Sequence, residues 1–153
     1  MPHAATQPVH RVVVGFDGSE PATAALDWAA DLAASTGARV EVVAAWSWPS
    51  GYGASLVIPV DYDPAGDATG MVTRAVDDAR SRHPDVEFVP VVVEGRTAPV
   101  LVEASTGADL LALGTRGHGE VAGILLGSVS EHCVAHAQCP VLVIGDRPPA
   151  RAA

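Results

Sequence analysis

The sequence contains no lysine, and its nine basic residues, all arginine, stand against eighteen acidic ones for a formal net charge of −9. A chain this acidic is poorly suited to bind nucleic acid or an anionic membrane through bulk electrostatics, so we expect neither partner. The missing lysine also excludes the P-loop, which needs one after its glycines. An anionic small ligand stays open, because backbone N–H groups at a helix N-terminus bind phosphate without lysine.

Cysteines and long apolar runs are equally scarce. Cys133 and Cys139 are the only cysteines, too few for a disulfide framework. No run approaches the 18 apolar residues of a membrane span, and "MPHAATQPVHR" has no apolar core of a secretory leader. We therefore expect a cytoplasmic protein without a membrane segment.

The 153 residues suit one domain of ordinary globular composition, 48% hydrophobic and 18% charged. We expect a flexible arm over residues 1–9, a single domain over 10–146 and a tail over 147–153.

β-branched runs alternate with helical patterns along this domain. The expected strands are 11–17, 38–46, 85–95, 109–115 and 139–146; the expected helices are 18–37, 67–84, 96–108 and 130–138. Ser19 is the expected N-cap of the first helix, and Gly37 its C-terminal glycine. A long connection is expected over 47–66. The alternation predicts an α/β fold, a single five-stranded parallel sheet with helices on both faces, Rossmann-like.

A glycine-rich stretch, "GTRGHGEVAGILLGSVS", follows the fourth expected strand at residues 114–130. In parallel sheets, ligands lie at the carboxyl ends of strands, where the strand order switches, so this stretch is a candidate site loop. It does not have the spacing of the dinucleotide fingerprint, which would also follow the first strand.

The spacing of Gly114, Gly117, Gly127 and Ser128 resembles the G-2x-G-9x-G-[S/T] ATP-binding motif of the universal stress protein family. The resemblance extends over about residues 10–145 and includes "VGFDGSE", "EGRTAPVLVEAS" and "CPVLVI". It implies an adenine nucleotide α-hydrolase-like fold that binds ATP, with Mg²⁺ bound through the phosphates. It also implies a homodimer formed through the last strand.

The chemistry of the stretch fits a phosphate site. Gly114 and Gly117 lack a Cβ, which lets the backbone approach a sugar or phosphate closely. Arg116 adds one mobile charge. The segment 127–130 opens the last helix, where unpaired N–H groups and the positive end of the helix dipole favour an anion.

That last segment contributes Gly127, Ser128, Val129 and Ser130 as candidate ligand residues, with the two serine hydroxyls as donors. A structural explanation competes with this one. Ser128 and Glu131 match a capping box, so the serine could simply cap the helix while the glycines turn the chain.

Three further candidates come from the first two strands. By the resemblance, Gly15 and Asp17 lie beside the nucleotide, with Asp17 near the base, the sugar or a phosphate-bound Mg²⁺. "FDGS" is also good turn chemistry by itself. By the resemblance, the backbone of Ala45 contacts adenine, although this alanine could equally fill the core. A phospho-accepting role for Asp17 is disfavoured, because the chain lacks the lysine of receiver domains.

His132 and His136 stand at i, i+4 in the last helix, which resembles half of a metal site. Cys133 points about 100° away from this pair, and Cys139 begins the next strand. We therefore expect no metal here.

The residues and the resemblance together leave three functions open, and the role in the stress response is implied by the resemblance alone. The favoured one is an ATP-binding regulator in the stress response. A slow ATPase or phosphotransfer enzyme on the same scaffold is the alternative, disfavoured because Arg116 is the sole visible cation and no catalytic base is evident. A dimeric interaction module without nucleotide would have lost the glycine motif, which is intact here.

Overall fold

Parallel strands alternate with helices throughout the domain, as the sequence predicts. The computed structural model describes residues 7–49, 57–115 and 126–145. In chain order the elements are β1 (Arg11–Gly15), α1 (Glu20–Thr36), β2 (Arg39–Trp46), α2 (Pro64–Arg82), β3 (Phe88–Glu94), α3 (Thr97–Ala104), β4 (Leu110–Gly114), α4 (Ser128–His136) and β5 (Val141–Ile144).

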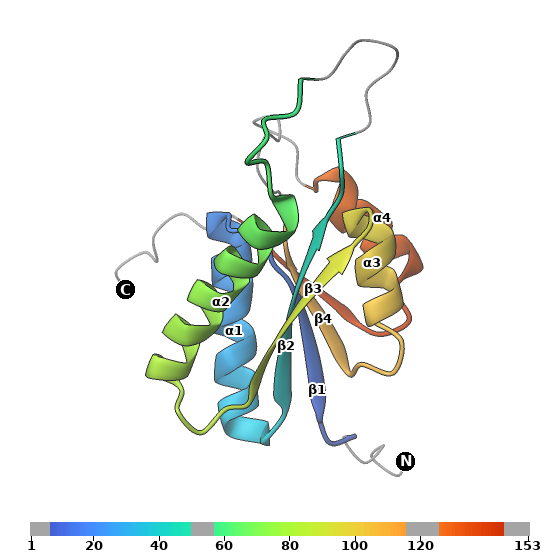
Figure 1. The fold of residues 1–153 in the computed structure, drawn as a ribbon. Coiled ribbons are helices and arrows are strands. Elements are labelled where there is room, and N and C mark those ends of the chain that lie inside the picture. The colour runs from blue at the N-terminus through green and yellow to red at the C-terminus, as the bar shows by residue number, and fades with distance from the viewer. Residues whose placement is uncertain (1–6, 50–56, 116–125, 146–153) are drawn as a thin grey trace, which may run out of the picture.

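The five strands form one parallel sheet in the order β3-β2-β1-β4-β5. The chain moves outward from β1 to β3 and then returns to add β4 on the other side of β1. Helices α1 and α2 cover one face and α3 and α4 the other (Figure 1). The predicted α/β class with helices on both faces is therefore confirmed. The order reverses between β1 and β4, where doubly wound sheets bind ligands at the carboxyl ends of the strands.

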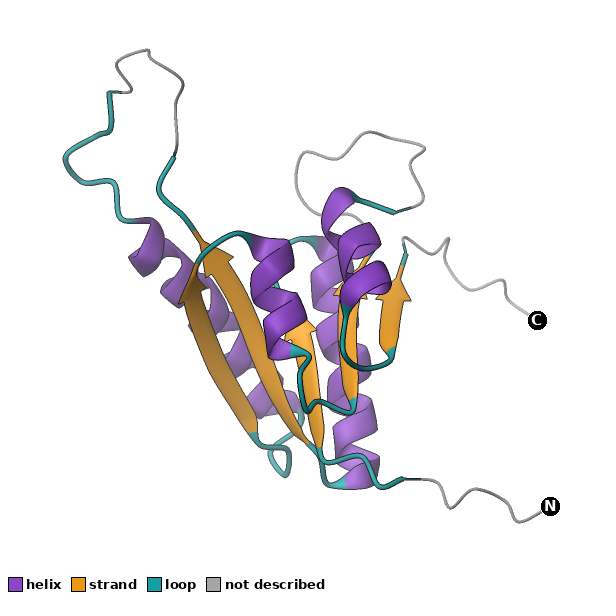
Figure 2. Cartoon of the chain, turned by 90° about the vertical axis from the view of Figure 1, so that its right-hand side faces the viewer, coloured by secondary structure: helices purple, strands orange, loops and turns teal. Residues whose placement is uncertain are grey.

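The sheet lies between its helices (Figure 2). An apolar layer on each face packs the sheet against them. Val12 and Val14 of β1 face α1 and α2, and Val13 faces the α3 and α4 side, where it packs with Leu101 and Leu111. Because both faces of β1 are covered, its central residues are all apolar and fully buried.

Helix α1 begins and ends where the sequence predicts. Ser19 is its N-cap, and the Ser19 hydroxyl accepts a hydrogen bond from the Ala22 N–H at 3.3 Å. Gly37 ends the helix in the left-handed conformation, with φ 78°, and donates its N–H to the Ala33 carbonyl. Pro21 lies in the first turn, where its missing N–H costs nothing.

The predicted start of α2 is wrong. The helix begins at Pro64, three residues before the predicted start, so the connection after β2 ends sooner than expected. Asp63 is the N-cap, and its carboxylate accepts from the Gly66 N–H at 2.9 Å. The "DPAG" residues thus start a helix rather than extending a loop, because aspartate before proline is a favourable helix start.

The ends of the chain lie mostly outside the described residues, which include neither 1–6 nor the predicted tail 147–153. Within the predicted arm, Val9 packs against the core layer under α1 and α2. No helix in the described ranges is long and apolar enough to cross a bilayer.

Candidate functional site

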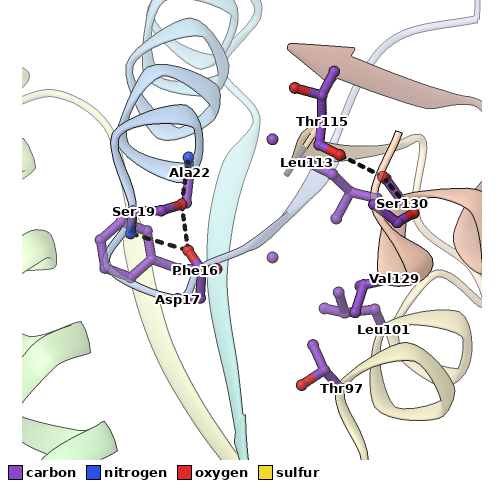
Figure 3. Close-up of a pocket in the computed structure, with 13 residues that line it drawn as sticks. Phe16, Asp17, Ser19, Ala22, Thr97, Leu101, Leu113, Thr115, Val129 and Ser130 are labelled. Atoms are coloured by element: carbon purple, nitrogen blue, oxygen red, sulfur yellow. Dashed lines mark hydrogen bonds between the residues drawn. The ribbon is translucent and has the colours of Figure 1, made fainter. Parts of the chain in front are cut away.

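A pocket of about 230 Å³ opens between the carboxyl ends of β1 and β4, at the switch in strand order. Its walls come from β1 and the turn into α1 on one side, and from β4, α3 and α4 on the other (Figure 3). The described residues that line it are Gly15, Phe16, Asp17, Ser19, Ala22, Thr97, Leu101, Leu113, Gly114, Thr115, Gly127, Val129 and Ser130.

The β1 side of the pocket is a closed turn. One carboxylate oxygen of Asp17 accepts hydrogen bonds from the Ser19 backbone N–H at 3.0 Å and from the Ser19 hydroxyl at 2.5 Å. The same hydroxyl caps α1 by accepting from Ala22. Asp17 therefore has the turn role that "FDGS" chemistry predicts, and its exposed side chain also lines the pocket.

The two strand-end glycines are required by packing. A Cβ on Gly15 would lie 2.7 Å from Leu113 Cδ2 and 2.8 Å from Leu101 Cδ1. A Cβ on Gly114 would lie 2.5 Å from Pro21 Cβ and 3.0 Å from the Ala22 nitrogen. The structure thus explains the glycine at position 114 differently from the prediction. Its missing Cβ faces the first turn of α1, not the ligand space.

The start of α4 also differs from the capping-box prediction. Gly127 is the N-cap and Ser128 is the first helical residue, and no side chain among the described residues caps this helix. The Gly127 N–H donates to the Thr115 carbonyl at 2.6 Å, which joins the helix start to the end of β4. The capping box is wrong because the chain turns into the helix one residue earlier than the Ser128–Glu131 spacing requires.

The two serines of α4 have different surroundings. The Ser130 hydroxyl is buried and donates inward, to the carbonyls of Thr115 at 2.8 Å and Gly127 at 3.1 Å. Ser128 is exposed and is not among the residues that line the pocket. The prediction that both hydroxyls serve a ligand as donors therefore does not fit Ser130, whose hydrogen is already engaged.

The N-terminus of α4 is the electropositive wall of the pocket. Within the described part of the chain, no acceptor pairs with the backbone N–H groups of Ser128, Val129 and Ser130. Such N–H groups and the helix dipole favour an anion. The N-terminus of α1 is the opposite case, because Ser19 caps it and Glu20 places a carboxylate in its first turn.

The predicted site residues separate into three groups. Lining the pocket together are Gly15, Asp17, Gly114, Gly127, Val129 and Ser130. Ala45 lies near the end of β2, where it pairs with Val93, and like Ser128 it is not among the lining residues. Arg116 and Gly117 lie outside the described residues.

Sequence reasoning missed Thr97, Leu101 and Thr115 as lining residues. Thr97 is the first residue of α3 and reaches the pocket because β3 also ends at this edge of the sheet. Leu101 lies one turn further along α3 and is buried against β1. The available signal for Thr97 and Thr115 was position, because each follows the carboxyl end of a strand within three residues.

The rings of His132 and His136 lie 4.4 Å apart on exposed positions of α4. Among the described residues, no third histidine, cysteine or acidic side chain completes a metal cluster with them. Cys133 lies between them in sequence but is fully buried, and desolvation raises the pKa of its thiol to about 11. A thiol with this pKa is a packing group rather than a thiolate ligand.

Comparison with known proteins places the chain among close relatives. The model of the universal stress protein family matches residues 8–145. A universal stress protein of Mycobacterium tuberculosis is 35% identical over 145 residues, which are 93% of this chain and 46% of the relative. This chain thus spans about half the length of the curated relatives that it matches.

Solved structures agree with the sequence comparison. A universal stress protein crystallised in complex with cAMP has a TM-score of 0.68 at 27% identity, over 92% of this chain and 99% of that one. A family member from Burkholderia pseudomallei has a TM-score of 0.62 at 30% identity, over 91% and 98% of the two chains.

Proposed function

This chain belongs to the universal stress protein family, and on that premise we propose that it binds an adenine nucleotide, ATP with Mg²⁺, and acts as a nucleotide-dependent regulator in the stress response. The observation that supports the proposal is the pocket at the switch between β1 and β4, one wall of which is the N-terminus of α4, where no described side chain forms a cap. The relative crystallised with cAMP, 27% identical to this chain, supports the adenine nucleotide class.

The charges around the pocket orient the ligand. A phosphate next to α4 meets backbone N–H groups that have no acceptor among the described residues, and the positive end of the helix dipole. A phosphate next to α1 would meet Asp17 and Glu20 at a helix end that Ser19 already caps. The phosphates therefore bind at α4, and the sugar and base lie toward Asp17, whose carboxylate accepts hydrogen bonds from N–H or O–H donors.

Mg²⁺ would bind chiefly through the phosphates. Hard cations take oxygen ligands, and Asp17 is the carboxylate among the described lining residues. The described residues contain no cluster of three groups that could hold a metal without the nucleotide. We therefore expect Mg²⁺ to bind together with ATP and not to the empty protein.

We favour binding over turnover. Fast phosphoryl transfer needs strong cationic stabilisation of the transferred group and a residue that orients the attacking water. The lining that the structure describes contains no arginine, lysine or histidine. Arg116, outside the described residues, is the candidate cation, and slow hydrolysis of ATP is the alternative function.

We also propose a homodimer through β5. This strand lies at an edge of the sheet, its partner on one side is β4, and its four residues are Val, Leu, Val and Ile, each half-buried. An apolar edge strand favours pairing with another strand, and a second copy of β5 would satisfy its backbone groups.

The experiment is mass analysis of nucleotide released from the purified protein, with titration of ATP, ADP, AMP and cAMP by calorimetry, with and without Mg²⁺. We expect adenine nucleotide in the released fraction and a saturable affinity for at least ATP. Absence of both from protein that is folded by circular dichroism would refute nucleotide binding. Multi-turnover release of phosphate would instead favour the enzyme.

A charge substitution localises the phosphates. Ser128→Glu puts an acid at the exposed first position of α4, where it suits the helix dipole and leaves folding intact. The added charge repels a bound phosphate, and we expect the affinity for ATP to fall by about tenfold or more. The control is Ser81→Glu, on an exposed position near the C-terminal end of α2. It adds the same charge and should leave the affinity for ATP unchanged.

A further inference from the structure

The Ser130 hydroxyl lies beside the proposed phosphate position but is directed into the protein (Figure 3). We propose that Ser130 is a positioning residue, whose hydroxyl holds the first turn of α4 in the geometry that binds phosphate and does not itself contact the phosphate. This inference rests on the proposed function, because it names how one residue serves the nucleotide site.

The hydrogen bonds of Ser130 carry the argument. A serine hydroxyl has one hydrogen to donate. Here that hydrogen points to two carbonyls, of Thr115 at 2.8 Å and Gly127 at 3.1 Å, and the residue is only 3% exposed. A phosphate oxygen is an acceptor and would have to take the hydrogen away from both carbonyls. The same hydroxyl cannot both position the turn and donate to the ligand.

The first turn of α4 is hydrogen-bonded to Thr115. The N–H of Thr115 donates to the Ile144 carbonyl at the end of β5, at 2.7 Å. Its carbonyl accepts from the Gly127 N–H at 2.6 Å and from Ser130. The first turn of α4 is therefore joined to the sheet at two points, one before the helix begins and one at its third residue.

This attachment sets the direction of the proposed ligand donors. The backbone N–H groups of Ser128 and Val129 lie between the two attachment points, at Gly127 and Ser130. Donors that are already oriented in the empty protein bind an anion more strongly, because binding does not have to order them. Removing the Ser130 hydroxyl loosens this turn and weakens phosphate binding without removing any contact to phosphate.

The test is Ser130→Ala, measured in two ways. First, AMP and adenosine are titrated, and we expect the AMP dissociation constant to rise about 3- to 10-fold while that of adenosine changes less than twofold. Second, amide hydrogen exchange is followed in the nucleotide-free protein. We expect faster exchange at the N–H groups of Gly127 and Glu131, which bond to the two carbonyls that Ser130 also holds.

Two variants complete the test. Ser105→Ala is the matched control, because Ser105 is also buried and also donates to a helix carbonyl, that of Val102, but lies at the far end of α3. We expect Ser105→Ala to lower the stability of the fold and to leave the ratio of the AMP and adenosine affinities unchanged. Ser130→Thr keeps the hydroxyl and restores both readouts.

Each outcome decides between the alternatives. If Ser130→Ala weakens AMP binding but leaves exchange in the empty protein unchanged, the hydroxyl contacts phosphate directly and the inference is wrong. It is also wrong if AMP and adenosine lose affinity equally. If the wild-type chain binds neither AMP nor ATP, the proposed function itself fails, and that result is visible before any variant is made.

Discussion

Gly114→Ala is the substitution that best tests the packing at the switch between β1 and β4. The new Cβ would lie 2.5 Å from Pro21 Cβ, 2.9 Å from the Pro21 carbonyl carbon and 3.0 Å from the Ala22 nitrogen. These are atoms of a proline ring and of helix backbone, which cannot rotate away as the end of a long side chain can. The first turn of α1 must therefore move, and overpacking of this kind costs about 1–3 kcal/mol.

The assay is thermal and urea unfolding of the variant. For a chain of this length, 1–3 kcal/mol corresponds to a melting temperature about 3–10 °C lower. Gly70→Ala is the control, because its Cβ meets only the end of the Arg74 side chain, at 3.3 Å inside α2. We expect that variant to gain about 0.5–1 kcal/mol from helix propensity.

One result would refute the reasoning about Gly114. If Gly114→Ala kept its full stability and still lost nucleotide affinity, the glycine would serve the close approach of the ligand, as the sequence motif suggests. The packing explanation requires the loss of stability in the empty protein, before any ligand is added.

Three further predictions concern parts of the fold outside the pocket. Asp63→Ala removes the N-cap of α2 and should lower the free energy of unfolding by about 1 kcal/mol in urea, whereas equal stability would show that the cap is dispensable. Hydrogen bonds from the backbone N–H groups of His10 and Arg11 lower the pKa of Asp109 below its usual value in the folded state. The ionised carboxylate therefore stabilises the fold above the usual pKa of aspartate, and this contribution is lost as the pH falls through the lowered pKa. Asp109→Asn should therefore be less stable than wild type at pH 7, and the difference should shrink as the pH falls through the lowered pKa of Asp109; a gap that does not change with pH would contradict this. Cys133, fully buried with a pKa of about 11, should react with a thiol reagent at pH 8 only after unfolding, and fast labelling of the native protein would overturn the assigned burial.

The sequence predicts most of the fold because its signals are local. Ser19 and Gly37 mark the two ends of α1, and each acts as a cap in the structure. The start of α2 was missed because proline and glycine in "DPAG" suggest a loop when they are read without their neighbours. The signal is nevertheless local: Asp63 caps the helix and Pro64 is its first residue, so the helix begins before the glycines.

The sequence predicts where the site lies in the fold but not what each of its residues does there. Motif spacing places Gly114 and Gly127 correctly in one pocket. It cannot show that Gly114 accommodates Pro21, because α1 lies about ninety residues earlier in the chain. It cannot show that Ser130 donates inward either, since the acceptor at Thr115 is fifteen residues away. These roles depend on contacts between elements that only the sheet order brings together.

The two ends of the segment between the motif glycines are joined by contacts that do not involve the ligand. One hydrogen bond, from the Gly127 N–H to the Thr115 carbonyl, joins the two ends of the segment between Gly114 and Gly127. Closing a loop costs little more when the loop is somewhat longer, so loop entropy alone does not fix its length. What the contacts keep is the return of the chain to β4, where the Gly127 N–H bonds to Thr115, followed by a helix whose third residue donates to the same carbonyl. A motif that satisfies these conditions yields an uncapped helix N-terminus beside β1, and the anion site follows from that geometry.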